Sequence, residues 1–508
     1  MQGVTTHTPV QLFFKCTNLL DTDGFSKSDP YVSVYDVTTG KKSLVGKTEV
    51  VKNNLNPVFK TGINVNYFFE VRQVYRFEVW DKDTGSADDF LGAVEMTMGE
   101  IMSSRDCTKT ANLEKRGSIT VSVLQQQQGN TLGTVRLTFR GKDLKKMDTF
   151  GKTDAYLVIN RLLPNGQKKL IHKTETVMKN LNPQWNATPD LDLRDLCGGD
   201  TAAACVAIDC FDWDKHSSDD AMGGFVVSVD DLMKGRGEFE LRLEKKGKAK
   251  SFGFICLDRC DFVPTTSFID HLRAGLQLNI AFSIDFTGSN GDWRQPNSLH
   301  HYDPTNPNAY IRAMLAVSNV VQEYDNDRQF PAYGFGAVTP FTQGTSHFFP
   351  LNGSAQNAFL PGMQAVIDTY ARLLPQLAFS GPTNFAPTIY NVTQGARQSP
   401  NVYTILMILT DGAITDMNQT IDAIVAADDA PLSIIIIGIG NADFSSMETL
   451  DADGKALVDG RKRASRRDLV QFVPFNQFAG RDPSMLAAAV LAEVPRQVER
   501  WGRLKSGA

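Results

Sequence analysis

The sequence predicts a multidomain protein, with two antiparallel β-sandwiches followed by an α/β domain that has a doubly wound, largely parallel sheet. Three observations predict it. The 508 residues are enough for several domains. Segments 11–124 and 132–260 repeat one another, and each alternates short strands with turns rich in Asp, Asn, Gly and Pro. After position 261, apolar strands instead alternate with helical stretches.

The duplication appears as short matches in the same order along both segments. A repeat of this length indicates a duplicated domain rather than a solenoid unit. The polar stretch 125–130 reads as the linker between the copies, because it cannot bury a core. We therefore expect domains at 1–128, 129–262 and 263–508. The matching segments are 25–32 with 150–157, 47–49 with 173–175, 55–57 with 181–183, and 80–83 with 211–214.

Aspartates at corresponding positions carry the chemical signal of the repeats. Loop aspartates usually cap turns, but that role does not account for ten of them at matching spacing. Five carboxylates in two loops repel one another unless a cation lies among them, and Ca²⁺ accepts several carboxylate oxygens. The aspartates are Asp23, Asp29, Asp81, Asp83 and Asp89 in the first copy, and Asp148, Asp154, Asp212, Asp214 and Asp220 in the second.

A different cluster of oxygen ligands follows two apolar strands in the last part of the chain. The run 278–284 ends in Asp285-Phe286-Thr287-Gly288-Ser289, and the run 403–409 ends in Thr410-Asp411-Gly412. Ligands of open α/β sheets collect at the carboxyl ends of strands, and Mg²⁺ prefers oxygen ligands. The pentapeptide alone is a weak signal, because Asp, Thr and Ser are common in turns.

Together with Thr383 in the turn Gly381-Pro382-Thr383-Asn384, these residues resemble the metal-ion-dependent adhesion site of von Willebrand factor A (vWA) domains. The resemblance implies a Rossmann-like fold and one Mg²⁺ or Mn²⁺ that accepts a carboxylate from a partner protein. The implied ligands are Asp285, Thr287, Ser289, Thr383 and Asp411.

The aspartate loops of the repeats resemble the calcium-binding loops of C2 domains, which are eight-stranded β-sandwiches. The resemblance implies roughly two to three Ca²⁺ ions per domain, with all ten aspartates as ligands. Phe25 and Phe150 are expected to enter the membrane interface, although each could instead pack under its own loop. Basic strand segments are better explained as solvated faces than as headgroup contacts; they contain Lys41, Lys42 and Lys47, and Lys168, Lys169 and Lys173.

The order of two C2 domains and one vWA domain resembles that of the copines. Several sequence stretches also resemble copine sequences: 268–270, 285–291, 330–337, 381–387, 410–416 and 470–475. The resemblance implies a calcium-dependent phospholipid-binding adaptor that moves from the cytoplasm to the plasma membrane or other anionic membranes when calcium rises. Its implied partners are phosphatidylserine-like lipids and a target protein that presents an acidic residue. The unusually basic loop 451–467 and the short tail after Trp501 depart from the family pattern.

Composition agrees with a cytoplasmic protein. The net charge of −5 does not favour nucleic-acid binding. Seven scattered cysteines favour a reducing compartment. We expect neither a signal peptide nor a membrane span, since the start lacks a basic and apolar pattern and no apolar run is long enough.

Two other classes of function are possible from the sequence. A membrane-delivered enzyme with a catalytic metal at Asp285 and Asp411 would need a nearby base or nucleophile, and no catalytic motif supplies one, so no enzymatic activity is expected. A calcium-independent scaffold would leave the ten aspartates unexplained. Further expectations are helices over 308–324, 362–374 and 485–500, and a solvated loop at His300-His301.

Overall fold

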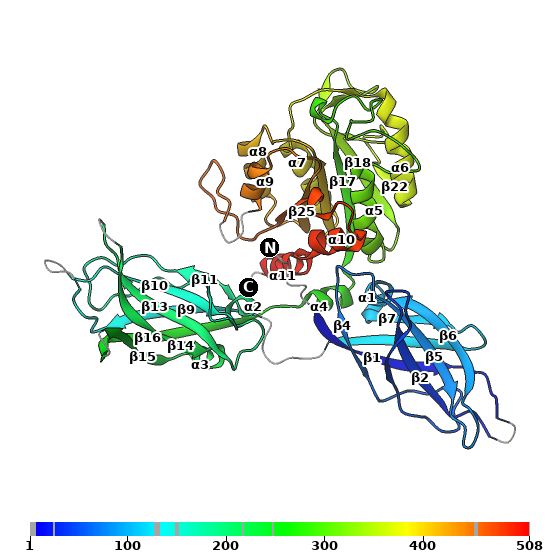
Figure 1. The fold of residues 1–508 in the computed structure, drawn as a ribbon, viewed down its shortest axis with the longest axis horizontal. Coiled ribbons are helices and arrows are strands. Elements are labelled where there is room, and N and C mark those ends of the chain that lie inside the picture. Colours follow the sequence, from blue (N-terminus) through cyan, green and yellow to red (C-terminus); the bar gives the residue numbers. More distant parts are fainter. Residues whose placement is uncertain are drawn as a thin grey trace. The chain divides into compact units, whose positions relative to one another are not determined.

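The structure is a computed structural model that describes residues 7–23, 26–125, 133–147, 152–215, 218–245, 248–451 and 456–506. The chain divides into two compact units. One unit contains the first repeat together with the C-terminal part from Phe268 onwards, and the other contains the second repeat (Figure 1).

The first repeat is an antiparallel sandwich of two four-stranded sheets, in the orders β4-β1-β8-β7 and β3-β2-β5-β6. Alternate residues of β1, from Val10 to Cys16, are buried between the sheets, as a strand with one core face requires. The elements are β1 (Thr8–Thr17), β2 (Pro30–Asp36), β3 (Ser43–Lys47), β4 (Ile63–Tyr67), β5 (Val74–Asp81), β6 (Asp89–Thr97), α1 (Met98–Met102), β7 (Thr108–Asn112) and β8 (Ser118–Gln125).

The second repeat has the same strand content. Its strands follow one path, β11-β10-β13-β14-β15-β16-β9-β12, in which β14 and β15 are joined through Gly224 and Arg242. Its elements are β9 (Gly133–Lys142), β10 (Ala155–Leu162), β11 (Lys168–Lys173), β12 (Leu191–Asp192), α2 (Leu193–Cys197), β13 (Ala204–Asp212), β14 (Asp220–Ser228), α3 (Val229–Met233), β15 (Gly237–Lys245) and β16 (Lys248–Pro264).

The repeated Lys-Thr-Glu segment has a structural explanation. The Thr48 hydroxyl accepts a 2.9 Å hydrogen bond from the backbone N–H of Val32, and the Thr174 hydroxyl accepts the same 2.9 Å bond from Leu157. These side chains satisfy strand N–H groups that would otherwise be buried without a partner. We therefore assign this repeated segment a structural role in the sandwich. The repeated aspartates remain the residues that indicate a function.

The C-terminal part is a doubly wound α/β domain around a largely parallel sheet, as predicted. Its sheet order is β21-β18-β17-β24-β25-β26, with β21 and β22 antiparallel to β18. Its strands are β17 (Gln277–Asp285), β18 (Gln329–Phe335), β19 (Ala337–Val338), β20 (Thr345–Ser346), β21 (Phe349–Pro350), β22 (Phe359–Pro361), β23 (Ala378–Phe379), β24 (Val402–Thr410), β25 (Leu432–Gly438) and β26 (Val470–Pro474).

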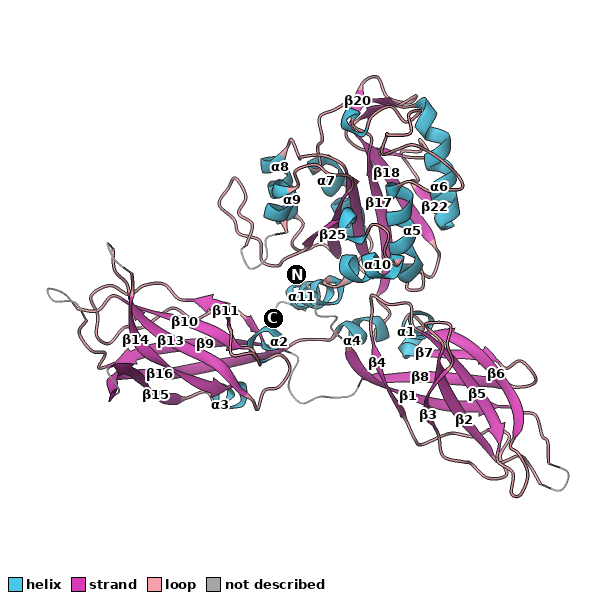
Figure 2. Cartoon of the chain, in the orientation of Figure 1, coloured by secondary structure: helices cyan, strands magenta, loops and turns pink. Residues whose placement is uncertain are grey.

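Helices cover both faces of this sheet (Figure 2). Ile280 and Phe282 of β17 pack in the core that contains α5 and α6, whereas Ala281 packs in a second core with α7 and α8. The helices are α4 (Phe268–Arg273), α5 (Ala309–Val321), α6 (Gly362–Leu373), α7 (Ala386–Gln398), α8 (Met417–Ala426), α9 (Ser445–Leu450), α10 (Pro483–Leu491) and α11 (Val494–Ser506). Short 3₁₀ turns lie at Arg105–Cys107, Gly288–Asn290, Leu374–Gln376 and Phe475–Phe478.

The prediction of one continuous helix over 485–500 was wrong. The stretch 485–500 contains the end of α10 and the start of α11, not one helix. Pro495 lies in the first turn of α11, where its missing N–H costs nothing, but it cannot continue the hydrogen bonds of α10. The helix α4 precedes the first strand of the α/β sheet and lies outside the three helices predicted from the sequence.

Within the first compact unit, the first sandwich packs against the C-terminal domain. The hydroxyls of Tyr67 and Tyr324 lie 2.6 Å apart, and Phe69 meets Phe268 edge to face at 4.9 Å. Glu323 accepts hydrogen bonds from Arg72 at 2.8 Å and from Thr97 at 2.5 Å. Apolar residues of both parts form one continuous core.

The support role of Thr48 is testable. Thr48→Val keeps the shape of the side chain but leaves the Val32 N–H without its acceptor, so we expect a loss of about 1–3 kcal/mol in the unfolding free energy of the first sandwich. Thr48→Ser retains the acceptor and should cost less. Denaturant unfolding of the two variants checks this, and equal stabilities would contradict the assigned role.

Candidate functional site

The candidate metal site of the C-terminal domain lies where two central parallel strands end. Asp285 is the last residue of β17, and Asp411 directly follows β24. The parallel register sets Ile284 beside Leu409, so the two acidic residues emerge next to one another. Both side chains are buried, Asp285 completely.

Hydroxyl groups surround the two carboxylates. Oδ1 of Asp285 accepts from the N–H of Thr287 at 2.8 Å and from its hydroxyl at 2.6 Å. Oδ2 of Asp285 accepts from the Thr410 hydroxyl at 2.6 Å. Ser289 donates to Oδ1 of Asp411 at 2.9 Å. Each carboxylate therefore has hydrogen-bond partners despite its burial, as buried charge requires.

Thr383 completes the group of residues predicted from the sequence. It is buried in the loop that follows β23, and its carbonyl accepts from the N–H of Thr415 at 2.8 Å. A Cβ atom added to Gly412 would lie 3.7 Å from the hydroxyl of Thr383 and 3.7 Å from that of Ser289. The fold thus brings the five candidate ligands together around the end of β24.

The electrostatics of the site favour a bound cation. Burial, followed by the charge of Asp411, raises the pKa of Asp285 to about 7, and burial also raises the pKa of Asp411. A divalent cation would offset both effects. Within the described residues no three His, Cys, Asp or Glu side chains are grouped so that they could hold a metal ion. The donor set here is two carboxylates and three hydroxyls, which fits Mg²⁺ or Mn²⁺ with retained waters.

The expectation that His300 lies in a solvated loop was wrong, because its side chain is fully buried. Nε2 of His300 donates to the carbonyl oxygen of Asp285 at 2.7 Å, so Nδ1 accepts from the Tyr370 hydroxyl at 2.7 Å. Burial lowers the pKa of His300 to about 3, so this imidazole is neutral and supports the Asp285 loop.

Sequence reasoning also missed two side chains beside the ligands. Thr410 bonds Asp285, and Asn290 donates to Oδ1 of Asp411 at 3.0 Å. Thr410 stands directly before Asp411 in the chain, so its position at a strand end was a usable signal. Asn290 is recognised only through the fold, because its side-chain Oδ1 accepts a hydrogen bond from the Tyr310 hydroxyl of α5 at 2.7 Å.

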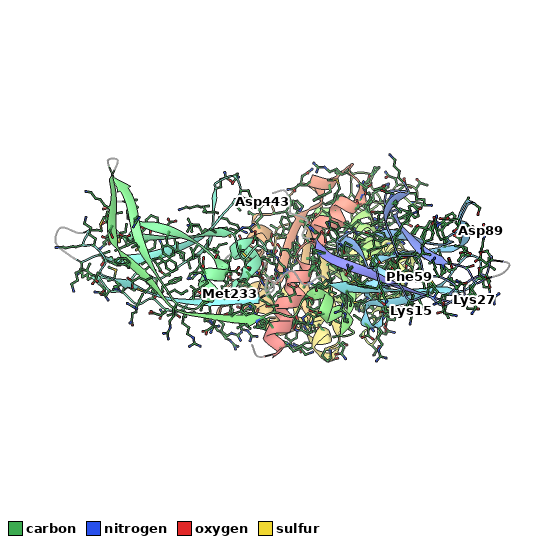
Figure 3. All side chains as sticks on the ribbon, turned by 90° about the horizontal axis from the view of Figure 1, so that it is seen from below. Lys15, Lys27, Phe59, Asp89, Met233 and Asp443 are labelled. Carbon is green, nitrogen blue, oxygen red and sulfur yellow. The ribbon has the colours of Figure 1, made fainter. Side chains whose placement is uncertain are left out.

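The aspartates of the first sandwich gather at one end of it. Asp81 ends β5, Asp89 begins β6, and the two are paired across the strands. Oδ1 of Asp81 accepts from the N–H of Asp29 at 2.5 Å, and Oδ1 of Asp29 accepts from Asn53 at 2.7 Å. Figure 3 shows Asp89 and Lys27, from the first loop, toward the same end of the sandwich.

Charge is concentrated at that end. Partial desolvation, then the carboxylates of Asp89, Asp81 and Asp23, raise the pKa of Asp83. A cation among these carboxylates, which range from buried Asp81 to exposed Asp89, would relieve the mutual repulsion. In the structure itself the described aspartates are not drawn together closely enough to hold a metal ion.

The second sandwich repeats these contacts. Asp212 and Asp220 are paired across β13 and β14. Oδ1 of Asp212 accepts from the N–H of Asp154 at 2.6 Å, and Oδ1 of Asp154 accepts from Lys179 at 2.5 Å. Asp214 lies two residues further along. The remaining candidates Asp148, Phe25 and Phe150 lie outside the described residues.

Fold and sites together define a protein with two C2 sandwiches and a vWA-like α/β domain. Family models agree with this architecture: the C2 domain model matches residues 12–113 and 133–242, and the Copine model matches 298–507. The chain therefore belongs to the copine family, with two C2 domains followed by a copine domain.

Solved structures resemble parts of the chain. A structure titled BON1-C2B is 23% identical, with 26% of this chain and 94% of that chain covered and a TM-score of 0.24. The calcium-bound pair of C2 domains from Extended-Synaptotagmin 2 is 13% identical, with 51% of this chain and 98% of that chain covered and a TM-score of 0.22. A single C2 domain of plant Extended Synaptotagmin 1 is 22% identical, with 23% and 94% covered and a TM-score of 0.21.

The combination of C2 and copine domains supports a membrane-binding adaptor. Across the described part of the chain, none of the helices has both the length and the apolar character needed to cross a membrane.

The raised pKa of Asp285 predicts a pH dependence of stability in the absence of metal. The folded chain keeps a proton on Asp285 up to about pH 7, whereas the unfolded chain releases it near about pH 4. The unfolding free energy of this domain should therefore fall as pH rises between these values, by about 1.4 kcal/mol per pH unit.

Thermal unfolding in chelator at pH 5 and pH 8 measures this fall. Asp285→Asn should reduce it, whereas the exposed loop variant Asp292→Asn should behave like the parent chain. An undiminished fall in Asp285→Asn would show that Asp285 does not carry the pH dependence.

Proposed function

We propose that the protein is a calcium-dependent phospholipid-binding adaptor that recruits target proteins through its vWA domain. One observation carries the proposal. In both sandwiches the innermost aspartate, Asp81 or Asp212, accepts a hydrogen bond from the backbone of the aspartate that precedes β2 or β10. The same carboxylate arrangement is thus built twice, in two separate cores.

Charge explains how calcium would control membrane binding. Without cations, the carboxylates at the loop end are repelled by anionic lipid. Roughly two to three Ca²⁺ ions per C2 domain would neutralise them and accept lipid phosphate or carboxylate oxygens. The predicted ligands are the ten repeated aspartates, and Phe25 and Phe150 would then enter the interface. The protein would reside in the cytoplasm and move to the plasma membrane or other anionic membranes when calcium rises.

Co-sedimentation with phosphatidylserine vesicles tests this switch. The parent chain should bind with Ca²⁺ and dissociate in chelator. Asp81→Asn with Asp83→Asn, or Asp212→Asn with Asp214→Asn, should each weaken binding about tenfold or more, because each pair removes ligands and charge from one domain. Phe25→Ala with Phe150→Ala should also weaken it.

Lys41→Ala with Lys169→Ala, which changes exposed positions away from the aspartates, serves as the matched control. Binding that ignores both Ca²⁺ and the aspartate pairs would indicate a calcium-independent scaffold instead.

The vWA site is proposed to bind Mg²⁺ or Mn²⁺ through Asp285, Thr287, Ser289, Thr383 and Asp411. When bound, the cation supplies an electrophilic position that accepts a carboxylate from a target protein. A binding role is proposed rather than catalysis, since the nearby imidazole of His300 has both nitrogens bonded to protein groups.

Calorimetry with Mn²⁺ tests this site in a chain that carries all four C2 substitutions named above. Thr383→Ala and Asp411→Ala should each lower Mn²⁺ affinity about tenfold or more, while Thr449→Ala on the exposed face of α9 should not. A pull-down of target proteins should weaken in the same variants. Unchanged Mn²⁺ affinity in both variants would argue against metal-dependent recruitment.

A further inference from the structure

Each C2 domain contains a tyrosine that contacts the acid next to a predicted calcium ligand. The hydroxyl of Tyr31 in β2 donates to Oδ2 of Asp88 at 2.7 Å. The hydroxyl of Tyr156 in β10 donates to Oδ2 of Asp219 at 2.6 Å. Asp88 and Asp219 directly precede Asp89 and Asp220 in the chain.

The second oxygen of the same carboxylate holds the loop backbone. Oδ1 of Asp88 accepts from the N–H of Asp83 at 3.4 Å. Oδ1 of Asp219 accepts from the N–H of Asp214 at 3.1 Å. In both domains one carboxylate thus connects a tyrosine hydroxyl to the backbone N–H of a predicted calcium ligand, Asp83 or Asp214. We call this pair of hydrogen bonds the bridge.

The tyrosines are themselves fixed by their surroundings. Tyr31 is 7% exposed and Tyr156 is 5% exposed, and each lies in a strand paired with the one that ends in the innermost aspartate. The ammonium groups of Lys47 and Lys173 lie over the two rings, 5.2 Å and 3.8 Å from their centroids. Because each ring is held in place, its hydroxyl restrains the carboxylate to which it donates, Asp88 or Asp219.

The two bridges differ in one contact. In the first domain Lys82 also donates to Oδ1 of Asp88 at 2.9 Å, whereas the corresponding position of the second domain is Trp213. The tyrosine contact is the part that both domains share. Its recurrence in two independently packed cores argues against a chance side-chain arrangement.

We propose that Tyr31 and Tyr156 are positioning residues that hold Asp83 and Asp89 of the first domain, and Asp214 and Asp220 of the second, in the arrangement that binds calcium. This role rests on the calcium-binding function proposed above. Carboxylates crowded into one loop repel one another, so a loop without the bridge would spread before the ion arrives. The bridge reduces the free energy needed to order the ligands on binding.

Calcium calorimetry on the full chain tests the proposal. The first domain is measured in the Asp212→Asn, Asp214→Asn background, and the second in the Asp81→Asn, Asp83→Asn background. Tyr31→Phe and Tyr156→Phe should each lower calcium affinity about tenfold in their own domain, because each removes only the hydroxyl. Tyr35→Phe, in the same strand as Tyr31, should change it less than about twofold.

A double-mutant cycle separates positioning from general destabilisation. Once Asp88→Ala has removed the bridge, adding Tyr31→Phe should produce no further loss of affinity. Thermal unfolding in chelator should be similar for Tyr31→Phe and its background. Additive losses, or unchanged affinity in both tyrosine variants, would overturn the role while the parent chains still bind calcium. Parent chains that bind no calcium would overturn the proposed function and this role with it.

Discussion

The sites of this protein depend on one constraint: carboxylates buried at strand ends must receive hydrogen bonds from fixed donors. Asp81 and Asp212 receive them from the backbone of the preceding loop. Asp285 receives them from Thr287 and Thr410. These donors hold the acids in place, and a bound cation would offset the cost of keeping several negative charges close together.

Strand register places these acids. Asp81 faces Asp89 across an antiparallel pair, and the parallel pair β17 and β24 carries Asp285 and Asp411 to the same edge. A slip of one residue would turn the side chains to the opposite face of the sheet. The apolar cores that fix register are therefore part of the site chemistry, and small losses in their packing should reduce metal affinity as well as stability.

In the first compact unit, the residues that join the first C2 domain to the vWA domain are not those predicted to bind metal. Arg72 shortly precedes β5 and Thr97 ends β6, so the groups that bond Glu323 are at the opposite ends of these strands from Asp81 and Asp89. The carbonyl of Tyr324 accepts from the N–H of Leu278 near the start of β17, whereas Asp285 is at its end. The contacts that Glu323 and Tyr324 make with the first C2 domain therefore lie at the opposite ends of these strands from Asp81, Asp89 and Asp285.

The sequence by itself determined the fold class, because strand periodicity and repeated spacing are local patterns. It also predicted the candidate ligands, from the repeated aspartates, from oxygen ligands placed after apolar runs and, for Thr383, from the resemblance to vWA domains. Only the tertiary structure decided which distant groups support them. His300 was misjudged because nothing local shows that α6 brings Tyr370 to its ring. The bridge from Tyr31 to Asp88 joins residues that are far apart in the chain, so strand pairing, not sequence spacing, creates it.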